Sequence, residues 1–139
     1  MKRRAFALAV PALVALAACS PSTQRQSAEQ PISVTPQVLA SLSALRAQEK
    51  FADLPGRDPS IERARLQGFI NELLDRLLKG LPANPRKSWV LGEMEPTVRS
   101  FYLEDTEARE RCVDYLEQIL HIVGIESANG AFAKYFITL

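Results

Sequence analysis

The sequence has few of the residues that usually carry chemistry. It contains one histidine (His121), one tryptophan and two cysteines (Cys19 and Cys112) in 139 residues. It has no glycine-rich phosphate loop and no set of cysteines at metal-binding spacing. One histidine, with no serine in a nucleophile-elbow context, gives no support for a hydrolase triad. The inventory therefore predicts no catalytic residue and no cofactor.

Clusters of basic residues are also missing. The chain has 17 Lys and Arg against 16 Asp and Glu, a formal net charge of +1. Loss of the first 18 residues would remove three bases (17 minus 3 is 14) and no acid, which gives 14 minus 16, or −2. Nucleic acid requires a concentrated basic face, so we expect no nucleic-acid partner.

The N-terminus carries the clearest motif. Lys2-Arg3-Arg4 precedes an apolar stretch, residues 5–15, that is too short to span a bilayer and is broken by Pro11. Leu16-Ala17-Ala18-Cys19 follows directly. This order resembles a bacterial lipoprotein signal, whose lipobox implies cleavage before Cys19 and a diacylglycerol on its sulfur. The alternative is an ordinary N-terminal helix or an uncleaved membrane anchor, with Cys19 incidental.

The resemblance implies an address in the bacterial cell envelope. Residues 1–18 would be a removed signal peptide, and acyl chains such as palmitate at Cys19 would hold the protein on a membrane, because each buried methylene contributes about 0.8 kcal/mol. Ser20 favours the outer membrane, facing the periplasm. Cys112 would then have no disulfide partner within the chain, and its simplest role is that of a small buried apolar group.

The remaining chain divides into a linker and one domain. Residues 19–35 are polar and contain Pro and Ser, which predicts a flexible linker after the lipidated cysteine. Residues 36–139 are enough for one domain with one hydrophobic core.

The domain is expected to be all-α. Apolar residues recur at helical spacing in four stretches, which start at Pro36, Pro59, Pro85 and after Asp105. Short connections between four amphipathic helices predict a compact four-helix bundle, and the aromatic residues near 132–136 predict a short C-terminal helix that could plug one end of it.

Several details of the helices follow from local rules. The first helix should reach about Ala52, Lys79-Gly80 should end the second with a left-handed glycine cap, and Pro96 should kink or divide the third. Gly124 should end the fourth. Acid-before-base spacing predicts two ion pairs within the second helix, Glu72–Arg76 and Asp75–Lys79.

One constellation could carry chemistry, on the fourth helix. Residues at spacings of three and four place five polar side chains on one face: Glu107, Glu110, Asp114, Glu117 and His121. Helical di-metal sites use Glu-x-x-His pairs with acids on facing helices, whereas Glu117 and His121 are four apart and no second such motif exists. We therefore expect a solvated charged face, with Glu110, Asp114, Glu117 and His121 kept as weak metal-ligand candidates.

The domain also resembles a known family. The residues that carry the resemblance are Leu103–Arg111, Tyr115-Leu116 and Gly124–Gly130. They are similar to a family of small bacterial helical domains of unknown function, which covers about residue 36 to the end. The resemblance implies a helical fold and supplies no activity and no site residues.

Two classes of function remain. A lipid-anchored interaction or accessory module, acting on another envelope protein, requires only an exposed patch on a stable bundle. A domain that binds a small ligand or a metal through the acidic face and His121 is the alternative. Trp89, with Tyr102, Tyr135 and Phe136, could line a groove for a partner, although aromatic residues in a small bundle usually fill its core.

Overall fold

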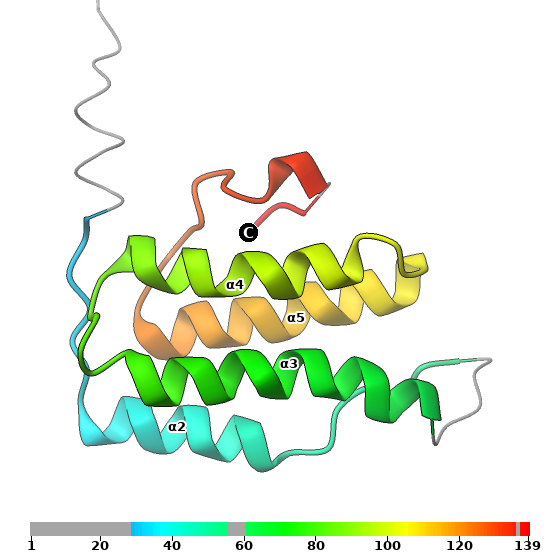
Figure 1. The fold of residues 1–139 in the computed structure, drawn as a ribbon, viewed down its shortest axis with the longest axis horizontal. Helices are drawn as coiled ribbons and strands as arrows, with labels where there is room; N and C mark the ends of the chain where they lie inside the picture. Colours follow the sequence, from blue (N-terminus) through cyan, green and yellow to red (C-terminus); the bar gives the residue numbers. More distant parts are fainter. Residues whose placement is uncertain (1–28, 56–60, 136) are drawn as a thin grey trace, which may run out of the picture.

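The computed structural model describes residues 29–55, 61–135 and 137–139. It contains α2 (Pro36–Ala47), α3 (Ile61–Gly80), α4 (Lys87–Phe101), α5 (Thr106–Val123) and a short 3-10 helix, η1 (Ala133–Tyr135) (Figure 1). No β-strand occurs in these ranges, so the all-α prediction is confirmed. The lipobox with Cys19, the start signal Asp58-Pro59 and Phe136 lie outside the described residues.

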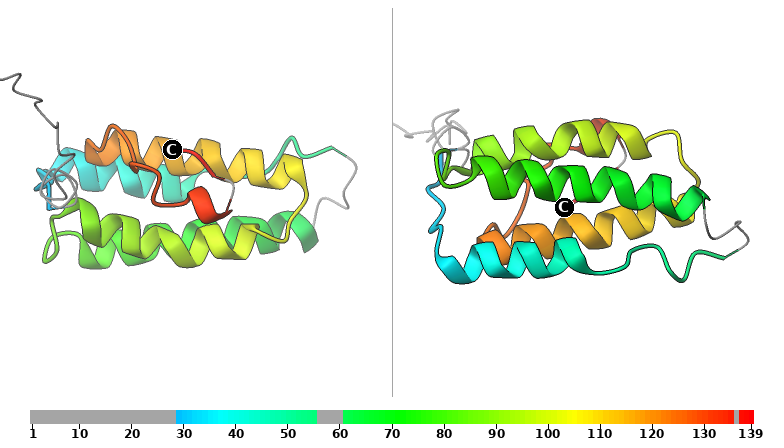
Figure 2. Two further views of the ribbon diagram at one scale, coloured as in Figure 1. Left: turned by 90° about the horizontal axis from the view of Figure 1, so that it is seen from above. Right: turned by 60° about the horizontal axis from the view of Figure 1, so that its bottom comes forward.

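The four helices lie side by side with their axes roughly aligned, and the C-terminal segment crosses over α4 and α5 (Figures 1 and 2). Helix α3 contacts each of the other three, and α5 contacts α2 and α4. The apolar stripe of each helix faces the common interior, where most side chains are fully buried. These include Leu42, Leu66, Ile70, Leu73, Leu74, Leu77, Val90, Met94, Val98, Phe101, Cys112, Leu116 and Ile119.

Three predicted helix ends are confirmed. Thr35 Oγ1 accepts a hydrogen bond from the Val38 amide at 3.2 Å, and Pro36 occupies the first helical position of α2. Asp105 caps α5 through a 2.9 Å bond from the Ala108 amide. Gly124 ends α5 in the left-handed conformation, with φ of 75°.

Helix α2 is shorter than the sequence predicts, because Lys50 folds back onto its end. The helix stops at Ala47 rather than near Ala52. The Lys50 ammonium is fully buried and donates to the carbonyls of Arg46 and Gln48, at 3.3 and 2.8 Å. These carbonyls carry the negative end of the helix dipole and have no further helical partner, so the cation replaces another turn of helix.

The prediction of a left-handed cap at Gly80 is wrong. Gly80 is the last residue of α3, and its conformation is not left-handed. A Cβ at this position would lie 2.5 Å from the Trp89 ring, so the glycine is needed because α4 packs closely there. The Asn84 side chain donates to the Gly80 carbonyl at 3.0 Å and thereby closes the end of α3.

Helix α4 starts at Lys87, two residues after the predicted Pro85, because residues 84–86 are engaged elsewhere. The Ile32 amide donates to the Pro85 carbonyl at 2.8 Å, and the Lys87 amide donates to the Gln30 carbonyl at 2.9 Å. Ile32 is buried. Residues 30–34, predicted as flexible linker, therefore form a clasp on the α3–α4 loop and belong to the folded domain.

The predicted ion pairs within α3 are wrong, because one member of each pair binds a neighbouring helix instead. Asp75 accepts from Arg46 of α2 at 2.8 Å. Arg76 donates to the carboxylate of Glu93 at 2.9 Å and to its carbonyl at 2.8 Å. This second bond lies one turn before Pro96, which lacks an amide donor, and α4 continues undivided through the proline.

Candidate functional site

The predicted polar face of α5 is present and exposed to solvent. Glu107, Glu110, Asp114, Glu117 and His121 are all exposed. Asp114 lies 3.5 Å from Arg111, which also binds Asp53 at 2.6 Å. Arg111 therefore ties this face to the segment that follows α2.

The polar face does not converge into a metal or ligand site. A hollow of about 550 Å³ on this face is open and lined by Asp114, Glu117, Gln118, His121 and Ile122. All five lie on α5, so no second described element supplies a facing ligand. Within the described ranges, no three His, Cys, Asp or Glu side chains are grouped so that they could hold a metal ion. The weak candidates Glu110, Asp114, Glu117 and His121 thus remain a row along one helix.

Cys112 is buried on the inner face of α5, as predicted. Burial raises the pKa of its thiol to about 12, because the thiolate would lose its hydration. A thiol in this state is a poor nucleophile at neutral pH. Its position is that of a packing residue.

The aromatic residues mostly fill the interior. Phe51 stacks on Phe101 with ring centroids 5.7 Å apart and meets Tyr115 edge-on at 5.1 Å. The Tyr115 hydroxyl accepts from the Phe51 amide at 3.0 Å. This bond holds Phe51 in a left-handed conformation, with φ of 59°, which a bulky residue rarely adopts. Trp89 is partly buried against α3.

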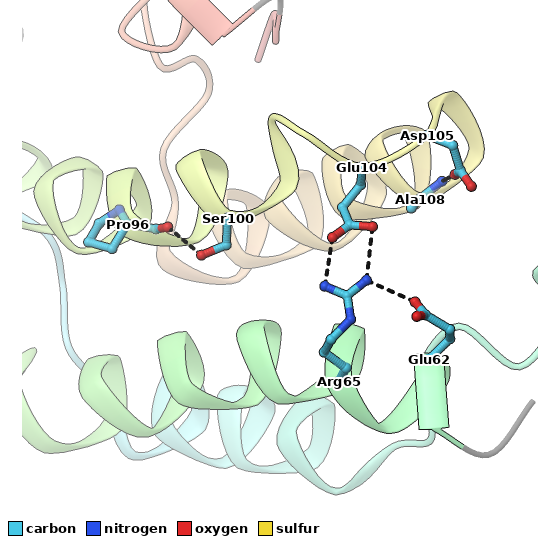
Figure 3. Close-up of polar contacts among 7 residues, drawn as sticks. All are labelled: Glu62, Arg65, Pro96, Ser100, Glu104, Asp105 and Ala108. Atoms are coloured by element: carbon cyan, nitrogen blue, oxygen red, sulfur yellow. Dashed lines mark hydrogen bonds and ion pairs between the residues drawn. The ribbon is translucent and has the colours of Figure 1, made fainter.

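The feature that the sequence analysis missed is the end of the bundle at the α4–α5 turn. Arg65 of α3 forms two bonds to the Glu104 carboxylate, at 2.6 and 3.0 Å, and one to Glu62 at 2.8 Å (Figure 3). The Glu104 side chain is only 13% exposed. A planar guanidinium that grips a carboxylate with two bonds fixes orientation as well as distance, so the turn is held firmly to α3.

Two large apolar side chains are displayed at this same end. Leu103 in the turn is 89% exposed, and Ile61 at the start of α3 is 75% exposed. We call this the distal end, defined by Ile61, Glu62, Arg65 and residues 102–105. In the sequence, Leu103 belongs to no helical apolar stripe and directly precedes Glu104-Asp105, where α5 starts. A large apolar residue at such a position could have been predicted to be exposed.

The distal end lies opposite the point where the chain enters the bundle. The clasp of residues 30–34 sits at the α3–α4 loop, and the distal end lies at the other ends of α3 and α4 (Figures 1 and 2). A helix of 20 residues such as α3 is about 30 Å long, at 1.5 Å per residue. Within the described residues, no helix has the length and apolar character needed to cross a membrane.

The chain was compared with known proteins. No curated protein and no solved structure matches it. The family model for the domain of unknown function DUF4844 matches residues 33–138, which is most of the chain and includes all four helices and the C-terminal segment. The match begins at Ser33, inside the clasp and directly after the buried Ile32. The chain therefore belongs to the DUF4844 family of domains, whose function is unknown.

Proposed function

We propose that this protein is a lipid-anchored, non-catalytic interaction module of the bacterial envelope that acts through its distal end. Cys19 is the proposed lipid attachment site, on the outer membrane facing the periplasm. The partner is proposed to be another envelope protein, which binds the distal end.

The observation that carries the proposal is that exposed apolar side chains lie at the end of the bundle opposite the point where the chain enters it. Leu103 projects from a turn that Arg65 and Glu104 hold in place, and Ile61 lies nearby at the start of α3, so contact at this surface costs little conformational entropy. The ten residues from Cys19 to Ala28 could extend at most about 35 Å. A chain anchored at Cys19 would join the bundle at the clasp, and the clasp lies about 30 Å from the distal end along α3.

A non-catalytic role agrees with the chemistry of the described residues. The single histidine is exposed beside an open hollow whose lining residues all lie on α5, and the Cys112 thiol is buried with a raised pKa. Neither group is placed as a nucleophile or as a general base, which must lie within hydrogen-bond reach of a reacting group.

Fractionation combined with site-specific crosslinking tests both parts of the proposal. The full-length protein carries a photoreactive amino acid at Leu103 or, as the matched control, at exposed Gln118 on α5. We expect a discrete crosslinked product from position 103 and none from position 118. We also expect Cys19→Ala to move the protein from the membrane to the soluble fraction without unfolding it.

Each part has its own contrary result. If the Cys19→Ala protein stays with the membrane, lipid attachment at Cys19 is not the anchor. If position 103 gives no product, or the same products as position 118, the distal end is not the interaction surface.

A further inference from the structure

A small crevice lies between α5 and the C-terminal segment, which crosses over α4 and α5 (Figures 1 and 2). It has a volume of about 210 Å³ and is lined by Thr106, Arg109, Glu110, Val113 and Ile137. The first four residues are spaced by three, four and seven positions, so they share one side of α5. Ile137 comes from the C-terminal segment. The crevice is therefore bounded by two parts of the fold, unlike the open hollow farther along α5.

The apolar wall of the crevice is fixed by packing. Ile137 is buried and belongs to the hydrophobic core, and Val113 is partly buried against that core. A ligand that contacts these two side chains meets a surface that is already formed. Binding at such a surface costs little reorganisation of the protein.

Arg109 stands apart from the other arginines that the structure describes. Residues 29–55, 61–135 and 137–139 contain eight arginines. Seven of them lie 3.8 Å or less from a carboxylate. Arg109 is half-buried, and its side chain forms no ion pair and no hydrogen bond within these ranges. A guanidinium has five donors in a planar fork that matches a carboxylate, so its binding capacity is unused here.

A negative charge without a partner lines the same crevice. Glu110 is exposed, and its carboxylate has no ion pair or hydrogen bond among the described residues. Adjacent residues of a helix point about 100° apart, so Arg109 and Glu110 flank the line from Thr106 to Val113 and do not neutralise each other. The crevice thus offers a cation, an anion and an apolar wall.

We propose that this crevice binds a small zwitterion, namely a free α-amino acid with an apolar side chain. Arg109 takes the carboxylate, Glu110 takes the ammonium, and Val113 and Ile137 contact the side chain. The volume of 210 Å³ is below the range of about 300 to 1,000 Å³ that drug-sized ligands occupy, so the ligand is a single amino acid and not a larger molecule.

The amino-acid site is separate from the proposed interaction surface. It uses none of the residues that define the distal end, and it does not depend on a lipid at Cys19. Crosslinking at Leu103 and binding in the crevice can therefore succeed or fail independently of each other.

An NMR titration of the full-length, ¹⁵N-labelled chain with leucine tests the site. We expect saturable shifts of the amides of Arg109, Glu110, Val113 and Ile137, with a dissociation constant of about 1 mM, which about nine non-hydrogen ligand atoms can supply. Two analogues of leucine test the charges: 4-methylpentanoate lacks the ammonium, and isopentylamine lacks the carboxylate. Each should bind about tenfold more weakly or less, because it loses a charge-assisted bond.

Arg109→Gln tests the residue that carries the argument. It should weaken leucine binding about tenfold or more. The matched control is Arg111→Gln, which removes the same charge from the same helix at a residue that binds Asp53 and does not line the crevice. This control should leave leucine binding unchanged.

Three results would overturn the amino-acid site. The first is the absence of saturable shifts with leucine. The second is equal binding of leucine and the two analogues, which is measured on the unchanged chain and so decides even where a variant does not fold. The third is an equal effect of Arg109→Gln and Arg111→Gln.

Discussion

Gly80 shows how the lack of one side chain sets the distance between two helices. A Cβ at this position would lie 2.5 and 2.7 Å from two atoms of the Trp89 ring, whereas a Cβ at Gly68, in the same helix, would meet nothing within 4 Å. Gly80→Ala should therefore lower the free energy of unfolding by about 1 to 3 kcal/mol, because the indole must move.

Gly68→Ala is the matched control for this prediction. It should raise stability by about 0.5 to 1 kcal/mol, since alanine in a helix interior restricts the unfolded chain more than glycine does. Urea unfolding of both variants measures the two changes. Stabilisation by both substitutions would mean that Trp89 does not approach Gly80 as closely as described.

Cys112 is predicted to resist alkylation in the folded protein. Its thiol is fully buried and its pKa is raised to about 12, so both access and thiolate are lacking at pH 8. In a Cys19→Ala background, iodoacetamide should modify the unfolded chain readily and the native chain only as fast as it unfolds. Rapid native labelling at low reagent concentration would show that α5 exposes this position.

The Cys112 thiol also predicts the direction in which stability changes at alkaline pH. The unfolded thiol loses its proton near pH 9, while the folded thiol keeps it until about pH 12. Between these values the folded state binds more protons, so the contribution of Cys112 to stability falls as the pH rises. Cys112→Ala should reduce this decline in a pH series of unfolding curves.

At the level of the helices, substitution of two leucines near α5 should change stability by very different amounts. Leu116 lies on the inner stripe of α5 and is fully buried, whereas Leu103 is 89% exposed in the turn before that helix. Leu116→Ala should cost about 2 to 5 kcal/mol, because it leaves a cavity in the core. Leu103→Ala should change stability by less than about 0.5 kcal/mol. Similar losses from both would contradict the assignment of the two faces.

The existence of the helices could be predicted from sequence, but several of their ends could not. Thr35, Asp105 and Gly124 act through bonds within a few residues, so local rules find them. The end of α2 depends on the burial of Lys50, and the end of α3 depends on Trp89 from the next helix. Such contacts form only after packing, and no local pattern contains them.

Ion pairs, too, depend on contacts between helices that local spacing does not predict. Spacing predicts that Arg76 binds Glu72 within α3, but the structure gives it two acceptors on Glu93 of α4. The Glu93 carbonyl lies next to the point where Pro96 interrupts the hydrogen bonds of α4. The bond to this carbonyl adds to the preference of Arg76 for Glu93 over Glu72.

For the whole molecule, the sequence predicted the all-α architecture, but not the contacts that define the distal end. The all-α bundle follows from four amphipathic periods, which the fold confirms. The distal end joins residues that are about 40 positions apart, through Arg65 and Glu104, and a bond from Lys134 to Glu95 joins the C-terminal segment to α4. Only the folded chain brings these residues together.

The clasp at residues 30–34 determines how the bundle bears mechanical load. A pull on the N-terminal side reaches the fold first through two short backbone bonds, Ile32 to Pro85 and Lys87 to Gln30, and through the buried Ile32 side chain. These contacts must give way before tension reaches α2. We therefore expect the clasp to yield before α2 when the chain is pulled from its N-terminal side.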